Sequence, residues 1–239
     1  GKIIAQAAAQ HLTPCVLELG GKSPTIIAAD ADLERTAKRI VWGKWINARQ
    51  TCIAPDYVLV QRNVMPTLID RLRETLRQFY GPDPQRDAGY GRIVNPRHVD
   101  RLAALMASGK VVHGGQIDRD DRFIAPTLLT DVALDSPIMQ EEIFGPVLSI
   151  IPFDTEDDAV RIANDTPYGL TDYVQTTDDA RRRRLAQRLR AGMVTVNMAP
   201  ADPKAPFGGY RQSGNGREWG LFGFDDYLEI KAALGYTPA

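Results

Sequence analysis

Residues 23–60, SPTIIAADADLERTAKRIVWGKWINARQTCIAPDYVLV, contain the pattern that decides the fold. The segment opens with a short apolar run at residues 23–28 and closes with a β-branched run at residues 52–60, and each run predicts a strand. Between them, Asp30 and Asp32 are candidate N-caps of a helix that continues to Trp45. One face of this helix is apolar and carries Leu33, Ala37, Ile40, Val41 and Trp45.

The rest of the chain continues this alternation of helices and strands. Helices are predicted at residues 1–11, 65–79, 98–108, 157–164 and 178–191, and strands at residues 15–19, 110–113, 127–130, 147–152, 172–175 and 193–197. The segments 81–91 and 199–224 are rich in glycine and predict loops. We therefore expect an α/β fold with a largely parallel sheet flanked by helices.

The composition excludes several classes of protein. The 239 residues are 44% hydrophobic and 25% charged, and 29 Lys and Arg against 30 Asp and Glu give a net charge of −1. This balance argues against nucleic acid or an anionic membrane as a main partner. No apolar run approaches the ~18 residues of a transmembrane helix, and the first residues lack a signal-peptide pattern. Two cysteines make no disulfide framework, so we expect a cytoplasmic protein.

Cys52 is the first candidate for chemistry. It follows a polar run, residues 47–51, at a predicted junction between a helix and a strand, and such junctions lie at the rim of an α/β sheet where ligand clefts form. An accessible thiolate there is a nucleophile, although a small apolar residue capping the strand explains Cys52 equally well. Cys15 lies within an apolar run and is interpreted as a core residue. The three histidines have no metal-ligand spacing, so no metal is predicted.

Glu18 is the second candidate. It stands between Leu17 and Leu19 in a predicted buried strand, where burial raises the pKa of a carboxyl group and suits it to general-base catalysis. The alternative is a strand-end Glu paired with an Arg or Lys. The two glycines that follow, Gly20 and Gly21, allow another segment or a ligand to approach the backbone closely.

The segment 141–146, EEIFGP, is the third candidate. Adjacent carboxylates on an extended segment point in opposite directions, so only one of Glu141 and Glu142 is expected to face a given site. A carboxylate there can accept hydrogen bonds from a ribose diol, and Phe144 can pack on a flat ring. A solvated pair of carboxylates before a turn is the alternative interpretation.

Together these segments resemble motifs of the aldehyde dehydrogenase superfamily, in that family's order and over essentially the whole chain. The motifs are LELGGKSP (17–24), QTC (50–52), EEIFGP (141–146), PYGL (167–170), VN (196–197), PFGG (206–209) and SGNGRE (213–218). The resemblance implies a mechanism in which Cys52 attacks an aldehyde carbonyl and a hydride passes to a nicotinamide. Glu18 would then activate the water that hydrolyses the thioester, and the backbone N–H of Cys52 would stabilise the oxyanion.

The same resemblance implies where the cofactor, NAD or NADP, and the small-molecule aldehyde bind. Glu142 resembles the residue that binds the nicotinamide ribose, and Phe144 resembles the residue beside the nicotinamide ring. Leu19 and Gly20 would also contact the cofactor. Phe207 would form a wall of the substrate tunnel.

Two residues depart from the family pattern. The family usually has a glycine in the segment that leads into the Gln-x-Cys core, whereas Arg49 stands just before Gln50 here. A guanidinium in this place is expected either to lower the pKa of Cys52 or to block the tunnel. Asp172 stands where small apolar residues are common.

Family members are longer, and their first half is a dinucleotide-binding domain. The resemblance therefore implies that residues 1–20 are the remnant of that domain, that residues 21–212 are the catalytic thiol domain, and that residues 213–239 are a returning segment with an oligomerisation strand. An unpaired edge strand favours association, so we expect a homo-oligomer. Two other readings stay open, namely a non-catalytic fragment without cofactor binding and an esterase-only thiol hydrolase that uses Cys52 and Glu18.

Overall fold

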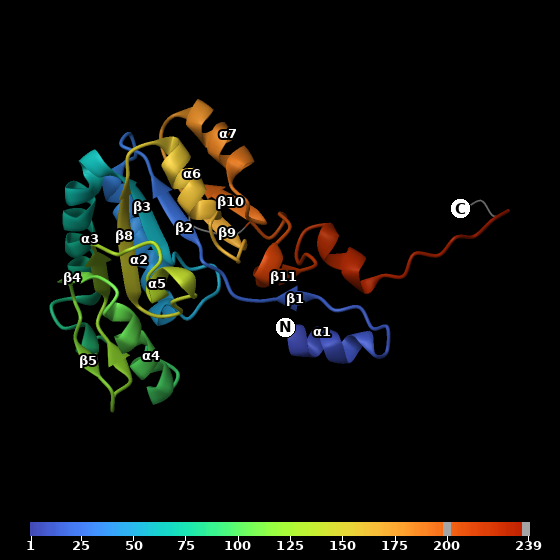
Figure 1. The fold of residues 1–239 in the computed structure, drawn as a ribbon, viewed down its shortest axis with the longest axis horizontal. Helices are drawn as coiled ribbons and strands as arrows, with labels where there is room; N and C mark the ends of the chain where they lie inside the picture. Colours follow the sequence, from blue (N-terminus) through green and yellow to red (C-terminus); the bar gives the residue numbers. More distant parts are fainter. Residues whose placement is uncertain (198–201, 236–239) are drawn as a thin grey trace.

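The structure, a computed structural model, describes residues 1–197 and 202–235 and is built around a seven-stranded sheet. The strand order is β10-β9-β2-β3-β8-β7-β4, and every neighbouring pair is parallel except β4 and β7 (Figure 1). The strands are β2 (Pro24–Ile27), β3 (Tyr57–Gln61), β4 (Lys110–His113), β7 (Thr127–Thr130), β8 (Val147–Phe153), β9 (Thr171–Gln175) and β10 (Met193–Val196). The predicted α/β fold with a largely parallel sheet is confirmed.

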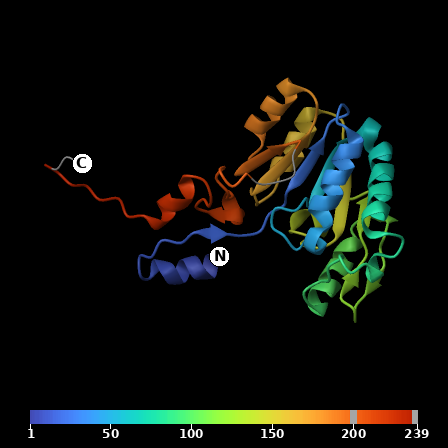
Figure 2. The same ribbon diagram turned by 180° about the vertical axis from the view of Figure 1, so that it is seen from behind.

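Helices cover both faces of this sheet (Figures 1 and 2). On one face, α2 (Leu33–Trp45) and α3 (Met65–Tyr80) pack against alternate strand residues such as Ile27 and Val58. On the other face, Ile26 and Leu59 pack against the second set of helices. That set comprises α4 (Pro96–Met106), α5 (Pro137–Gln140), α6 (Glu156–Asn164) and α7 (Asp179–Arg188). Because successive residues of a strand point to opposite faces, a two-sided core requires the near-continuous apolar runs seen in β2 and β3.

Of the two candidate caps, Asp32 begins α2, because its side chain accepts a hydrogen bond from the backbone N–H of Arg35. Asp30 has a different role, because it binds groups at the start of α7. Its carboxylate accepts bonds from the Thr176 and Thr177 hydroxyls and from Arg181 of α7. Burial alone would raise the pKa of Asp30, but these hydrogen bonds and the arginine lower it to about 2. Asp30 thus joins the start of α2 to the start of α7.

The strand predicted at residues 52–60 begins only at Tyr57, so the prediction is wrong for residues 52–56. The preceding 3-10 segment η1 (Ile46–Arg49) ends in left-handed backbone, and tight turns follow from it. The N–H of Thr51 bonds the carbonyl of Arg49, and the N–H of Ala54 bonds the carbonyl of Thr51. Pro55 has no N–H for a ladder. Residues 52–56 therefore form a turn, and the strand follows from Tyr57.

The buried strand predicted at residues 15–19 is also wrong. Only β1 (Leu17–Glu18) forms; it is partly exposed and pairs antiparallel with β11 (Gly214–Asn215), outside the seven-stranded sheet. The preceding α1 (Lys2–Ala9) buries none of its residues. Segments near the two ends of the chain thus lie side by side, away from the main sheet (Figure 1).

Several short elements were not predicted. They are α5, the antiparallel pair β5 (Ile117–Asp118) and β6 (Phe123–Ile124), and the 3-10 turns η2 (Arg62–Val64), η3 (Pro84–Arg86), η4 (Arg211–Ser213) and η5 (Phe222–Tyr227). The loop predicted at 199–224 is mostly loop over residues 202–224, while residues 199–201 lie outside the described part of the chain. None of the described helices is both long and apolar enough to cross a membrane.

Residues 228–235 form no strand in this chain and leave Leu228, Ile230 and Leu234 largely exposed. We expect sedimentation velocity to show self-association, because exposed apolar chain that can add to a sheet edge favours pairing. The charged variant Ile230→Lys should shift the distribution toward monomer. A single monomeric species for the unaltered chain would contradict the prediction.

Candidate active site

Cys52 lies on the turn between η1 and β3, where it is half-buried. Its carbonyl oxygen lies so close to Gly21 that a Cβ there would be 3.0 Å away, which explains the glycine. Burial raises the pKa of the Cys52 thiol, the backbone N–H of Ile53 lowers it, and the carboxylates of Glu18 and Glu142 raise it again. The thiol therefore holds its proton more tightly than a solvated cysteine does.

The sulfur opens into a cavity of about 550 Å³ that draws its lining from separate parts of the chain. Of the residues predicted from the sequence, Cys52, Glu18, Leu19, Gly20, Glu142 and Phe144 all line it. Glu141 of the third candidate segment, Tyr168 of the PYGL motif, His98 and Arg101 complete the lining; no role in the site was predicted for the last two. The nucleophile candidate and the general-base candidate thus share one pocket.

Glu18 enters this pocket from β1. Both of its carboxylate oxygens are buried and have no hydrogen-bond partner among the described residues, so the strand-end ion pair is not formed. Gly208, in the left-handed region at φ +147°, leaves room for it, since a Cβ there would lie 3.0 Å from Oε1 of Glu18. Burial and the nearby Glu218 raise the pKa of Glu18, while Arg217 lowers it. A carboxylate with a raised pKa and free oxygens is suited to accept a proton.

Glu142 reaches the same pocket from the segment that follows α5. Its Oε1 accepts a hydrogen bond from the N–H of Gly21 at 3.1 Å and lies 3.5 Å from Nη1 of Arg49. Its Oε2 lies against Gly20, where any side chain would collide with it. Burial raises the pKa of Glu142, and Arg49 and the Gly21 N–H oppose that effect. The carboxylate is therefore docked on the Gly20–Gly21 turn with one oxygen still free.

Both Glu141 and Glu142 line the pocket, so the expectation that only one faces it is wrong. Glu141 itself has extended backbone, but the chain bends at this residue and again at Gly145, directly after Phe144 with its left-handed φ of 50°. Arg101 of α4 holds this bend by donating to the carbonyls of Glu142 and Ile143. Glu141 remains at the rim with 49% of its side chain exposed, against 16% for Glu142.

Arg49 lines neither this pocket nor the second one described below, so the expected block is not observed. Burial raises the pKa of Cys52, and Arg49 is not among the groups that act directly on that pKa. Its guanidinium is fully buried instead and pairs with Asp56 at 2.5 Å. Lys22 also pairs with Asp56, and Asp56 accepts a third bond from the N–H of Ile143. Sequence reasoning missed this buried cluster of charges.

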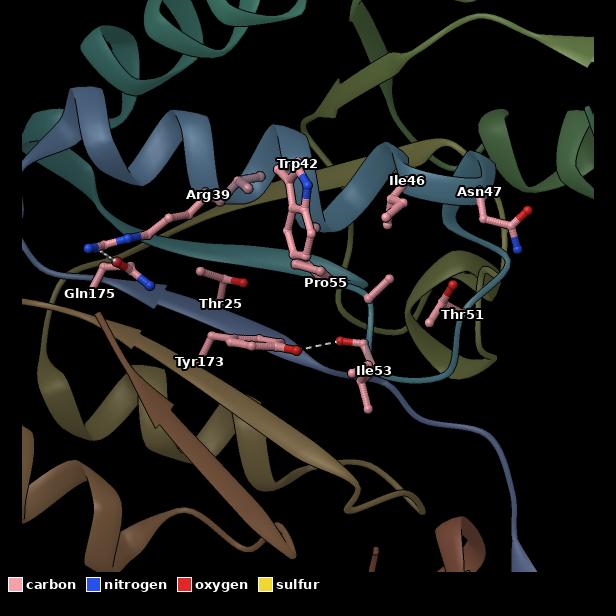
Figure 3. A pocket seen from close by; sticks show the side chains of 13 residues that line it. Thr25, Arg39, Trp42, Ile46, Asn47, Thr51, Ile53, Pro55, Tyr173 and Gln175 are labelled. Atoms are coloured by element: carbon pink, nitrogen blue, oxygen red, sulfur yellow. Dashed lines mark hydrogen bonds between the residues drawn. The ribbon is translucent and has the colours of Figure 1, made fainter. Parts of the chain in front are cut away.

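A second cavity, of about 260 Å³, adjoins the segment that carries Cys52 (Figure 3). Thr51 and Ile53, the neighbours of Cys52, line it together with Trp42 of α2, Ile46 of η1 and Tyr173 of β9. The Tyr173 hydroxyl donates to the carbonyl of Ile53 at 2.6 Å and so fixes one wall to the nucleophile turn. Most of the surface of this cavity is apolar, although the polar residues Thr25, Arg39, Asn47, Thr51 and Gln175 also belong to its lining. One signal for it was available in the sequence: Trp42 of α2 and Ile46, which follows that helix directly, are large apolar residues four positions apart and outside the predicted apolar face.

Phe207 lines neither cavity. It is buried against Trp219, with the ring centroids 4.8 Å apart, and its backbone pairs with Glu218. Its role as a tunnel wall stays a prediction. Within residues 1–197 and 202–235, no group of His, Cys, Asp and Glu is arranged to hold a metal ion.

The comparisons with known proteins agree with this geometry. The model of the Aldehyde dehydrogenase family matches residues 1–233. The chain belongs to the aldehyde dehydrogenase family. The 4,4'-diaponeurosporen-aldehyde dehydrogenase of Staphylococcus aureus is 44% identical over 239 residues, covering 98% of this chain and 52% of that relative. The dimeric NADP-preferring aldehyde dehydrogenase of Mus musculus is 42% identical, again over 98% of this chain and 52% of the relative.

Solved aldehyde dehydrogenases share the fold. A substrate-bound AldH of Staphylococcus aureus has a TM-score of 0.91 at 41% identity, covering 100% of this chain and 55% of that one. An indole-3-acetaldehyde dehydrogenase of P. syringae, solved with NAD+, has a TM-score of 0.88 at 36% identity, covering 96% and 49%. The chain spans about half the length of the curated relatives that it matches.

Proposed function

We propose that this chain is the catalytic half of an NAD(P)-dependent aldehyde dehydrogenase that oxidises an aldehyde to a carboxylic acid. The observation that carries the proposal is the shared pocket of Cys52, Glu18 and Glu142. Within it, Cys52 is the nucleophile and Glu18 the general base. Membership of the family supports these roles.

The cofactor side of Cys52 suits a nicotinamide riboside. Oε1 of Glu142 is taken by Gly21 and Arg49, and Oε2 has no hydrogen-bond partner among the described residues, so it is free to accept from a ribose hydroxyl. The absence of a side chain at Gly20 keeps that oxygen clear. Phe144 and Leu19 add apolar surface to the same cavity, which suits a flat ring.

The reaction begins when the Cys52 thiol passes its proton to water and the sulfur bonds the aldehyde carbon to give the oxyanion of a thiohemiacetal. The backbone N–H of Cys52 stabilises the oxyanion. A nicotinamide cofactor held by Glu142 and Phe144 would accept the hydride from that carbon, and a thioester would remain on Cys52. Glu18 then takes a proton from water, the water oxygen bonds the thioester carbon, and the carbon–sulfur bond breaks to release the carboxylic acid and the Cys52 thiolate.

We propose that the body of the aldehyde lies in the second cavity. Its walls include the large apolar side chains of Trp42, Ile46 and Tyr173, and the two neighbours of Cys52, Thr51 and Ile53, also line it. A substrate in this cavity would therefore lie beside the nucleophile turn, while a nicotinamide would occupy the cavity that Cys52 and Glu142 share. The substrate class that fits is an aldehyde with an apolar body, because such lining offers few polar partners.

Replacing Cys52 with alanine tests the proposal. With an apolar aldehyde and NAD or NADP, the chain is expected to form reduced cofactor, measured by its absorbance, and Cys52→Ala is expected to reduce the rate by at least about 10³-fold, because no other group can carry the thioester. Hydrolysis of a nitrophenyl ester, measured in parallel, should be lost with it. Cys15→Ala is the matched control, since Cys15 does not line the pocket, and it should retain both activities.

The same pair of assays separates the two alternatives. Ester hydrolysis that depends on Cys52 without any formation of reduced cofactor would favour the esterase-only reading. Absence of both activities in a folded chain would favour the non-catalytic fragment and contradict the proposed function.

A further inference from the structure

Arg49 has an unusual position for a charged residue. It has a left-handed φ of 64°, the third such residue in a row after Asn47 and Ala48, and none of its side chain is exposed. Backbone in this region favours glycine, and burial of a guanidinium is costly unless it is paired. Both costs must be offset by the contacts that the side chain makes.

The first set of contacts holds the nucleophile turn. The Arg49 guanidinium donates through Nη2 to the carbonyl of Ala54 at 3.0 Å and through Nε to the carbonyl of Pro55 at 3.5 Å. These carbonyls follow Cys52 closely, and the N–H of Thr51, just before it, bonds the Arg49 carbonyl. Arg49 therefore contacts the turn both before and after Cys52.

The second set of contacts reaches the carboxylates. Nη2 of Arg49 lies 2.5 Å from Asp56, and Nη1 lies 3.5 Å from Glu142. Lys22 also pairs with Asp56, whereas Nζ of Lys44, fully buried nearby, has no partner among the described residues. Arg49 is thus the cation that joins Glu142 to the buried cluster.

We propose that Arg49 is a positioning residue that ties the turn of Cys52 to the carboxylate of Glu142 and balances the negative charge beside the sulfur. One guanidinium then sets both the place of the nucleophile and the place of the ribose-binding group. The inference rests on the proposed roles of Cys52 and Glu142. It concerns the reactivity of the thiol, which can be measured whether or not the chain oxidises an aldehyde.

The charged groups around the sulfur decide what removal of Arg49 does. Glu18 from β1 and Glu142 from the segment after α5 both disfavour the thiolate. The other titratable or charged residues that line the pocket are His98 and Arg101 of α4, Glu141 and Tyr168. Without Arg49, the charge of Glu142 is no longer balanced, so the thiolate of Cys52 becomes harder to form.

The test is the pH profile of Cys52 alkylation by iodoacetamide, followed by mass spectrometry of the labelled peptides. In Arg49→Gly the midpoint of the profile is expected to move to higher pH, and the rate near pH 7 to fall roughly threefold to tenfold, because half to one unit of pKa changes the thiolate fraction by that factor. The rate on the alkaline plateau should stay close to that of the unaltered chain. Arg49→Lys keeps the charge and should keep the midpoint.

Glu142→Gln gives the opposite result, a midpoint at lower pH, and the double variant Arg49→Gly/Glu142→Gln should return toward the unaltered profile. Cys15, the other free cysteine, is labelled in the same samples and should keep its profile in every variant. If Arg49→Gly does not fold, Glu142→Gln and Arg49→Lys decide the matter. An unchanged midpoint in Glu142→Gln, or a midpoint in Arg49→Lys that shifts as far as in Arg49→Gly, would overturn the proposal.

Discussion

Replacing Asp56 with asparagine is expected to lower the free energy of unfolding by about 3–5 kcal/mol, the usual cost of removing one partner from a buried ion pair. Asp56 is fully buried and faces Lys22 and Arg49, which are also fully buried. Asparagine has nearly the same shape, so the change removes charge and little volume. Lys22 is then left without its anion, Arg49 keeps only the longer contact with Glu142, and the N–H of Ile143 loses a charged acceptor.

Urea unfolding measures this effect as a lower midpoint at an unchanged slope. The matched control is Asp154→Asn, because Asp154 is an exposed partner of Arg62 and an exposed pair contributes at most about 1 kcal/mol. Equal midpoints for the two variants would contradict the prediction.

The pH dependence of the Asp56→Asn variant provides a second check. Burial lowers the pKa of Lys22, and Asp56 opposes that effect. Without Asp56, the folded chain releases the lysine proton at lower pH, while the unfolded chain holds it up to the ordinary value. The unfolded state then binds more protons, so the stability of the variant should rise as the pH rises from neutral into the alkaline range.

The sequence was sufficient for the fold because the sheet depends on local patterns. The runs at β2 and β8 are apolar on both faces, as strands between two helical layers must be. The exceptions at residues 15–19 and 52–56 have physical reasons. β1 pairs with residues about 200 positions away, which no local pattern reveals, and the left-handed residues of η1 direct the chain into a turn.

The candidate site was predicted only in part, because a motif identifies individual residues and does not indicate which other residues lie next to them in the fold. Cys52, Glu18 and Glu142 could be proposed from their motifs, and the structure brings them to one cavity. The pairing of Arg49 with Asp56 was not foreseeable, since a sequence does not indicate which charges are buried together. A lysine in LELGGKSP looks like a solvated residue, and only the fold buries Lys22.

Asp172 is the other residue whose effect depends on burial. It lies on β9 with its carboxyl group almost fully buried, and burial raises its pKa to about 8. Its neighbour Tyr173 faces the α2 side of the sheet, so Asp172 points to the opposite side. Tyr57 feels its charge, because the pKa of Tyr57 is raised first by burial and second by Asp172. At neutral pH the carboxyl group is therefore mostly protonated.

This raised pKa makes the stability of the chain depend on pH. An unfolded Asp releases its proton at its ordinary pKa near 4, whereas the folded chain keeps the proton up to about pH 8. Over this interval the folded state binds more protons, so stability falls as the pH rises and becomes level above pH 8. Each unit of pKa difference corresponds to about 1.4 kcal/mol, so the cumulative loss amounts to several kcal/mol.

In Asp172→Asn this loss should disappear, because an amide does not ionise. The variant is expected to be close to the unaltered chain in stability at pH 5 and more stable than it at pH 8, as measured by urea unfolding at each pH. Asp165→Asn is the matched control, since Asp165 is exposed and lies at the end of α6 on the same side of the sheet, and its difference from the unaltered chain should not change with pH. If the stability of Asp172→Asn and that of the unaltered chain change in parallel from pH 5 to pH 8, Asp172 does not keep its proton in the folded state. Its ionised carboxylate must then be stabilised by a partner in the folded chain.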